Sequence, residues 1–253
     1  MIALVHFLAA DINVGTHVQR DGLDLDTIWS TGVAMVVVIG MGLYLRAKAT
    51  SAVPGKLQLA WEVAVEAITT QVEGSIGPRG AAVVPLALAL FVFILVANWF
   101  SVFGIGSEIE WLGTPTSDIN VTLALALVVI VPVHIASIRS RGLAGYVKHY
   151  VSQPFPKVLF PVNAFINGVE EIAKPLTLAL RLFGNLLSGG LMLALIAALG
   201  VWTIFHVPIG YGFTPLLDLI WKPFDLAIGA IQAFIFALLT ILYFDSAMST
   251  EHA

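Results

Sequence analysis

The sequence contains no cysteine and has few charged side chains. Of its 253 residues, 11% are Asp, Glu, Lys or Arg, whereas soluble domains carry about 25%. The absence of cysteine excludes disulfides, thiol nucleophiles, iron–sulfur clusters and cysteine-based zinc sites. The hydrophobic share is 58% and the mean hydropathy is +0.94. Because so few charges could not keep a soluble surface hydrated, the composition predicts a protein that crosses a membrane several times.

Further signals of common functional sites are missing. The six histidines are scattered, and none forms the i,i+4 pair that would suggest a metal site. No glycine-rich phosphate loop stands between a strand and a helix, and the net charge of −4 disfavours nucleic-acid binding. We therefore expect no metal, no cofactor and no nucleic-acid partner. Residues 1–10 are apolar without a preceding Lys or Arg, so we expect them to be retained rather than cleaved as a signal peptide.

Hydrophobic runs predict an all-α membrane protein with about five transmembrane helices. A span needs about 20 apolar residues. The runs occupy residues 28–45, 81–103, 119–138, 161–199 and 213–248. Between the first two runs, Glu62, Glu66 and Glu73 recur on one helical face, which predicts an amphipathic helix at the membrane surface over residues 55–76. We detect no internal repeat.

We interpret residues 1–253 as a single integral membrane domain with three parts. Residues 1–26 form an outer segment, residues 27–157 hold the first three spans with the interfacial helix and a connector, and residues 158–253 hold the last two helices. As helices these last two would be about 58 Å and about 54 Å long at 1.5 Å per residue, whereas a bilayer core is about 30 Å thick. They must therefore be steeply tilted or bent, and Pro175 and Pro223 are natural bend points.

The basic residues lie on one side of the predicted topology. Two segments on that side hold Arg46, Lys48, Lys56, Arg79, Arg139, Arg141, Lys148 and Lys157. The loops at 104–118 and 200–212, on the opposite side, hold no Lys or Arg. The positive-inside rule therefore predicts a cytoplasmic basic side, with the N-terminus outside and the C-terminus in the cytoplasm.

Arg181 is the most informative charge, because it lies near the middle of a long apolar helix. A charge at the bilayer centre costs about 2.5–3.5 kcal/mol on insertion scales, so such a residue is a functional candidate. Gly184, Asn185 and Ser188 follow at helical spacing on the same side, and small residues allow another helix to approach closely. In the alternative interpretation, Arg181 is buried and paired with an acid of the same bundle, such as Asp225.

Other polar residues accompany Arg181 on the neighbouring helical turns. Glu170 and Lys174 share its stripe, with Glu171 beside them, and their i,i+4 spacing is also explained by simple helix stabilisation. On the last helix, Asp225 and Gln232 share another stripe. Asn98 lies on the second span, where interhelical hydrogen bonding is the simpler role. His134 precedes the basic end of the third span, where we expect a partly exposed histidine without a function. These residues describe an ion pathway without specifying the ion.

Five segments together resemble subunit a of the bacterial F-type ATP synthase. They are residues 50–56, 118–122, 174–176, 180–185 and 232–236, in order and at the spacing of that family. The resemblance implies a non-catalytic, proton-translocating stator subunit in the bacterial plasma membrane, with nucleotide chemistry on partner subunits. It implies as partners the c-subunit ring, the b-type peripheral stalk and the remaining subunits of the synthase.

The resemblance also implies a mechanism and a set of site residues. Protons would cross through two offset half-channels, bind a carboxylate on each ring subunit, and leave after nearly a full turn. Arg181 would hold the ionised carboxylate and block direct proton passage. Asn185, Gln232 and Asn98 fall on the family's polar positions, and Ser188 lies on the Arg181 face.

This sequence departs from the family pattern at several places. Gly190 stands where the family often has an acid, and Asp225 where it often has a histidine, so that the acid is on the facing helix. Asn167 stands where some members have Glu, and the acids at 170 and 171, about one turn further on, would compensate.

Two other classes of function compete with this interpretation. A self-contained ion-coupled transporter with a central intramembrane Arg would show paired repeats and broken helices. An intramembrane hydrolase would use Ser188 with His206, but Ser188 lacks a nucleophile motif.

Overall fold

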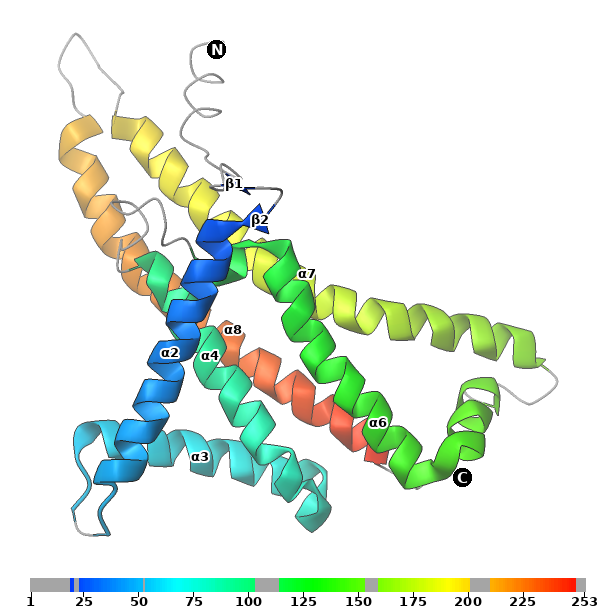
Figure 1. The fold of residues 1–253 in the computed structure, drawn as a ribbon. Coiled ribbons are helices and arrows are strands. Elements are labelled where there is room, and N and C mark those ends of the chain that lie inside the picture. Colours follow the sequence, from blue (N-terminus) through cyan, green and yellow to red (C-terminus); the bar gives the residue numbers. More distant parts are fainter. Residues whose placement is uncertain are drawn as a thin grey trace.

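The fold is almost entirely helical in the part of the chain that the structure describes. This computed structural model covers residues 19–20, 23–51, 53–102, 114–152, 159–200 and 210–248. The exception is a pair of two-residue antiparallel strands, β1 (Gln19–Arg20) and β2 (Leu23–Asp24), just before the first helix (Figure 1). The predicted all-α class is confirmed. The interpretations placed on residues 1–18, on His206 and on residues 249–253 lie outside the described residues.

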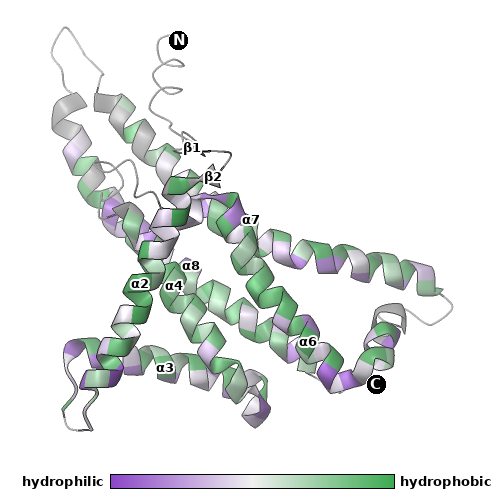
Figure 2. Cartoon of the chain, in the orientation of Figure 1, coloured by the Kyte–Doolittle hydropathy of each residue, from purple (hydrophilic) through white to green (hydrophobic). Residues whose placement is uncertain are grey.

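Six long helices make up the described fold. They are α2 (Leu25–Lys48), α3 (Lys56–Ser75), α4 (Val84–Val102), α6 (Ile119–Ser152), α7 (Phe160–Gly200) and α8 (Gly210–Met248). Short 3₁₀ helices, η1 (Gly77–Ala82) and η2 (Pro115–Ser117), precede α4 and α6. Among the described residues, α2, α6 and α8 are long and apolar enough to cross a membrane, and α4 is a shorter apolar helix. Figure 2 shows α4 as mostly hydrophobic, with polar residues on α3, at the end of α6 and along the first half of α7.

Helix α3 is amphipathic, as the spacing of its acids predicts. Ile68 and Val72 are buried against Ala237 and Ile241 of α8, while the three glutamates are exposed. Gln58 fastens the preceding loop, because its side chain accepts from the Thr50 backbone N–H at 3.2 Å and donates to the Thr50 carbonyl at 2.8 Å. The helix therefore packs by its apolar face and presents its carboxylates outward.

Helix α6 differs from the sequence prediction at its C-terminal end. We expected the third span to stop at residue 138, followed by a connector, but the helix continues to Ser152. It is interrupted at Gly142, whose φ of 71° and ψ of 163° lie outside the helical range. Glycine adopts positive φ without the steric cost that a Cβ would bring, so the chain turns there and resumes the helix. Arg139, Arg141 and Lys148 of the basic segment therefore lie within α6.

Helices α7 and α8 form the long pair that the sequence predicts. Pro175 lies inside α7, and Pro215 and Pro223 lie inside α8. In Figure 1, the first part of α7 runs across the view and its second part turns toward the start of α8. Interior proline removes one helical hydrogen bond and crowds the preceding turn, which explains bending at such positions.

The core lies where α4, α6, α7 and α8 meet. Its largest buried side chains include Ile94 of α4, Val129 of α6, Leu178 and Leu182 of α7, and Phe236 of α8. Leucines four residues apart lie on one face of a helix. Because Leu178 and Leu182 point into this core, they fix which face of α7 is turned outward.

Candidate functional site

Arg181 lies on the outward face of α7. Its side chain is exposed, and no ion pair or hydrogen bond joins it to another residue in the described part of the chain. Leu178, Ala179 and Leu182 are buried beside it, so the apolar side of the helix is the anchored side. The alternative in which Arg181 is a buried partner of Asp225 is therefore wrong. Arg181 therefore lies on the surface of the described part of the chain.

Small side chains continue the Arg181 face in both directions along α7. Thr177, Gly184 and Ser188 are exposed on the same face as Arg181. The Thr177 hydroxyl donates to the Ala173 carbonyl at 2.8 Å, and the Ser188 hydroxyl donates to the Asn185 carbonyl at 2.8 Å. Because both hydroxyls bond back to their own helix, neither projects far from it. Small side chains therefore flank the long side chain of Arg181 on this face.

Asp225 of α8 lies directly against the backbone of α7. Its Oδ1 is 3.0 Å from where a Cβ on Gly189 would stand. Gly189 is buried, whereas Gly190 is exposed with nothing within 4 Å of an added Cβ. Asp225 therefore contacts α7 at Gly189, one residue before Gly190, the position at which the sequence departs from the family pattern. A glycine at 189 makes room for the carboxylate between the two helices.

Asn98 of α4 and Gln232 of α8 join Asp225 in a row of polar side chains, which we call the α4–α7–α8 seam. Asn98 is 3% exposed, donates from Nδ2 to the Gly229 carbonyl at 3.2 Å, and accepts at Oδ1 from the Thr116 hydroxyl at 2.8 Å. Gln232 is 7% exposed, and its Nε2 has no hydrogen-bond partner within the described residues. Asp225, Gly229 and Gln232 follow one another at helical spacing on α8. A line of polar groups therefore runs along the inside of α8.

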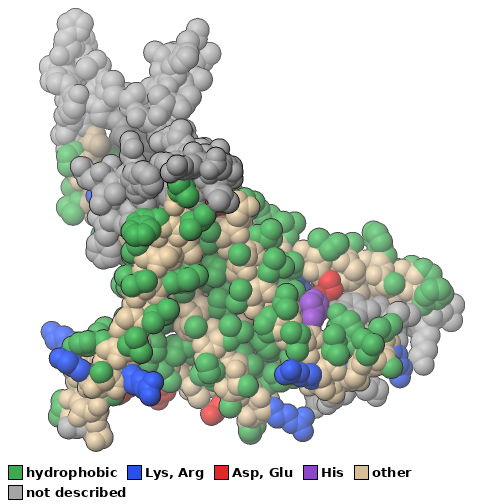
Figure 3. All heavy atoms as spheres, viewed as in Figure 1, with side chains coloured by type: hydrophobic (Ala, Val, Ile, Leu, Met, Phe, Trp, Pro, Cys, Tyr) green, Lys and Arg blue, Asp and Glu red, His purple; other side chains and the backbone are tan. Residues whose placement is uncertain are grey.

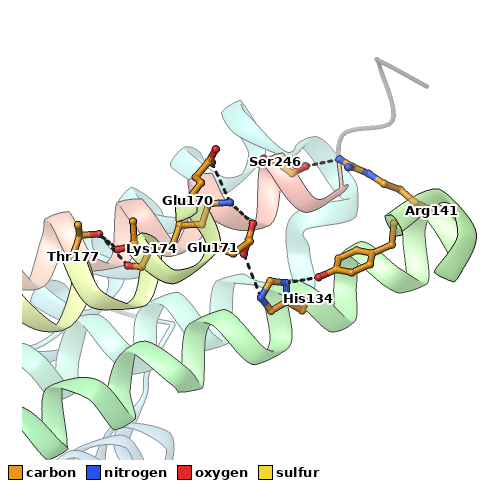
Figure 4. A network of polar contacts seen from close by, with 9 residues as sticks. His134, Arg141, Glu170, Glu171, Lys174, Thr177 and Ser246 are labelled. Atoms are coloured by element: carbon orange, nitrogen blue, oxygen red, sulfur yellow. Dashed lines mark hydrogen bonds and ion pairs between the residues drawn. The ribbon is translucent and has the colours of Figure 1, made fainter. Parts of the chain in front are cut away.

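A second polar cluster lies before Arg181 on α7, where α7 meets the ends of α6 and α8 (Figure 4). Lys174 Nζ is 2.6 Å from Glu171 Oε1 and 3.2 Å from Glu170 Oε1. Glu171 Oε2 is in turn 3.4 Å from Nε2 of His134, whose Nδ1 is 3.2 Å from the Tyr146 hydroxyl. The Glu171 side chain is 21% exposed and that of Glu170 is 59% exposed, so Glu171 is the inner of the two acids.

A small cavity opens beside this cluster. It measures about 40 Å³. Its polar lining consists of His134, Ser137, Arg141, Glu171, Lys174, Tyr243 and Ser246. Arg141 Nη2 donates to the Ser246 carbonyl at 2.6 Å, and the Ser140 hydroxyl donates to the Ala247 carbonyl at 3.0 Å. These bonds satisfy carbonyls at the end of α8 that have no partner within the helix.

The structure thus divides the sequence-predicted site residues into three groups. Arg181 and Ser188 lie on the exposed face of α7, with Asn185 half-buried beside them. Asp225, Gln232 and Asn98 gather along the α4–α7–α8 seam, and Glu170 and Glu171 lie at the other end of α7. Within the described residues no group of three or more His, Asp and Glu is placed to hold a metal ion.

Sequence reasoning did not anticipate the contacts of His134 and Arg141. The His134 side chain is 31% exposed, as expected of a partly exposed histidine, but it also faces Glu171 from the neighbouring helix. A signal was present, since His134, Ser137 and Arg141 recur at intervals of three and four residues on one face of α6. That pattern shows a polar face but does not say which helix lies opposite it.

Comparisons with known proteins identify a family and relatives to which this chain is similar. A family model described as "ATP synthase A chain" matches residues 27–245. The chain is similar to "ATP synthase subunit a" of Acidothermus cellulolyticus, at 47% identity over 99% of this chain and 88% of that one. It is similar to the protein of the same name from Mycobacterium marinum at 45% identity, over 96% of each chain, and to that of Shewanella sp. strain MR-4 at 39% identity, over 79% and 78%.

Proposed function

The chain belongs to the ATP synthase A chain family, and from that premise we propose that it is the proton-translocating stator subunit of a bacterial ATP synthase. In this proposal it forms two offset half-channels against a rotating ring of c subunits, and it couples the proton-motive force to ATP synthesis. It performs no nucleotide chemistry itself, which belongs to partner subunits. Besides the ring, its partners are the b-type peripheral stalk and the other subunits of the synthase.

The observation that carries the proposal is an exposed Arg181 on a smooth helical face, with a polar cluster on either side along α7. A carboxylate cannot be ionised in lipid without a compensating charge, because desolvation of an unpaired charge is very costly. A guanidinium stays protonated under all ordinary conditions, so it favours the ionised form of a carboxylate that comes close to it. Arg181 would thus hold each ring carboxylate in its deprotonated state while it passes.

The two clusters correspond to two separate routes. Asp225, Asn98 and Gln232 form the route on one side of Arg181, toward the α7–α8 connection. Glu170 and Glu171, with Lys174, form the route on the other side, near the ends of α6 and α8. A proton that enters by one cluster and leaves by the other must be carried past Arg181 on the ring, since a cation at that position repels a positive charge that approaches it. Asn185 and Ser188 line the face along which the ring helix would move.

The orientation follows from the basic residues. Figure 3 shows Lys and Arg side chains gathered along the lower edge of the molecule, over the ends of α2, α3 and α6. Under the positive-inside rule that edge faces the cytoplasm of a bacterial cell, with the N-terminus outside and the C-terminus inside. The Glu170–Glu171 cluster is then the inner half-channel, and the Asp225 seam is the outer one.

The test is Arg181→Ala in inverted membrane vesicles that carry the whole synthase. We expect the loss of proton-driven ATP synthesis, while ATP hydrolysis by the soluble head is partly retained. Leu180→Ala is the matched control, because Leu180 is exposed on another face of the same turn. Coupled synthesis at the unmodified rate in Arg181→Ala would refute the proposal. So would recovery of the chain as a functional transporter on its own, which is the outcome expected of a self-contained transporter.

A further inference from the structure

We infer that His134 is a proton carrier of the inner half-channel, acting with Glu171 to pass protons between the membrane interior and the cytoplasm. This inference rests on the proposed function and names a residue on α6 that the resemblance does not assign. It starts from a contact between two helices far apart in sequence, His134 Nε2 to Glu171 Oε2 at 3.4 Å.

Both nitrogens of the His134 ring have a polar neighbour. Nε2 faces the Glu171 carboxylate, and Nδ1 is 3.2 Å from the Tyr146 hydroxyl (Figure 4). With the proton on Nε2, the imidazole donates to Glu171 and accepts from Tyr146. Imidazole can take up a proton on one nitrogen and release another from the opposite nitrogen, which makes histidine suited to proton transfer. Polar groups thus orient both ring nitrogens of His134, as a residue that accepts and releases protons requires.

Charged and titratable side chains from three helices surround His134. From α7 it is faced by Glu171, whose other oxygen is 2.6 Å from the Lys174 ammonium, and Lys174 also reaches Glu170. From α6 come Tyr146 and Arg141, and from α8 comes Tyr243, across the small cavity. Lys174 and Glu171 balance each other as an ion pair. Of the remaining groups, only the imidazole has two ring nitrogens that can accept and donate protons.

His134 lies at the boundary between the packed interior and the surface of the chain. Its side chain is 31% exposed, and it lines the cavity of about 40 Å³ together with Glu171 and Arg141. A water molecule needs about 10–15 Å³ of such space, so the cavity is wide enough for water to reach the ring. Glu171 precedes Arg181 by ten residues, about 15 Å along the helix at 1.5 Å per residue.

The proposed step moves protons only. A ring carboxylic acid releases its proton to water on the inner side and becomes a carboxylate beside Arg181. That proton adds to the free lone pair of one His134 nitrogen and forms an imidazolium, which is stabilised by the Glu171 carboxylate. The proton on the other nitrogen then leaves to cytoplasmic water, and the neutral imidazole is restored. In ATP hydrolysis the same steps run in reverse.

The experiment measures ATP-driven proton pumping and ATP synthesis in inverted vesicles, whose outer face is the cytoplasmic face, while the pH outside is varied. We expect His134→Gln to lower the coupled rate several-fold and to flatten its dependence on the external pH. Tyr146→Phe removes only the hydroxyl beside Nδ1, and we expect it to displace the pH profile with a smaller loss of rate. Glu66→Gln is the control, because Glu66 is an exposed carboxylate on α3 that belongs to neither proposed half-channel.

The possible outcomes distinguish failure of this inference from failure of the proposed function. If His134→Gln keeps the unmodified rate and pH profile, or lowers the rate equally at every pH, His134 only ties α6 to α7 and the inference is wrong. If His134→Gln does not assemble, Tyr146→Phe decides alone, and an unchanged profile overturns the inference. Arg181→Ala is measured alongside. Coupled ATP synthesis in Arg181→Ala would refute the proposed function itself. Loss of synthesis in Arg181→Ala together with a normal pH profile in His134→Gln would refute only the role of His134.

Discussion

Gly189→Ala should impair proton translocation without unfolding the helix pair. The added Cβ would stand 3.0 Å from Asp225 Oδ1 and 3.7 Å from its Cγ. Even favourable C–H···O contacts have C···O separations of about 3.3–3.6 Å, so the carboxylate must move away by a few tenths of an ångström. A single methyl group on α7 thereby displaces a proposed proton-binding group on α8.

The effect on stability is small because two contributions oppose each other. Alanine favours a helix interior over glycine by about 0.5–1 kcal/mol. Overpacking of a close contact costs about 1–3 kcal/mol, so the free energy of unfolding should fall by about 0–2.5 kcal/mol. Gly190→Ala is a matched control, because Gly190 is the next residue, is exposed, and has nothing within 4 Å of an added Cβ. It should keep the helix-propensity gain and full activity.

The assay is respiration-driven ATP synthesis in inverted vesicles, with synthase content measured in the same membranes. We expect Gly189→Ala to synthesise ATP more slowly than Gly190→Ala at equal content. In an Asp225→Asn background, Gly189→Ala should add little further loss, since contacting residues in one pathway are not additive. Equal rates for the two alanine variants, or full additivity with Asp225→Asn, would show that the position of the Asp225 carboxylate does not limit proton flow.

Two further predictions concern the faces of α7 and α8. Asp225→Asn removes the only ionisable group of the described α4–α7–α8 seam, which consists of Asn98, Gln232, Gly189 and Asp225. It should slow proton entry and change how coupled synthesis depends on the pH of the outer face. An unchanged rate and pH profile would show that Asp225 is not on the pathway. Gly184→Leu places a bulky side chain on the exposed Arg181 face, where an added Cβ meets nothing within this chain. It should leave the isolated chain folded but reduce copurification of the c ring, and normal copurification with normal coupling would show that another face meets the ring.

The fold was largely predictable because lipid imposes simple rules on sequence. Long apolar runs define α2, α4 and α8, and the recurrence of Glu62, Glu66 and Glu73 identifies α3 as amphipathic. The end of α6 was not predictable from hydropathy, because a helix can continue after its apolar stretch stops. Only the backbone conformation of Gly142 shows where the break occurs.

The candidate site was predictable where one helix carries the signal. Spacing alone places Arg181, Gly184 and Ser188 on one face of α7, but whether that face is outward depends on the burial of Leu178 and Leu182 against other helices. The contact of Gly189 with Asp225 and that of His134 with Glu171 depend on the register between helices. Register is set by side-chain packing over the whole bundle, which periodicity within one segment does not contain.

The bonds at the end of α8 determine how this chain would bear a mechanical load. Under the proposed function, a ring that turns against the Arg181 face would push sideways on α7 and α8, and the chain would have to resist that torque. Arg141 and Ser140 of α6 donate to the carbonyls of Ser246 and Ala247, so the C-terminal end of α8 is anchored to a second helix. Force applied to α8 would therefore be shared with α6 at this end.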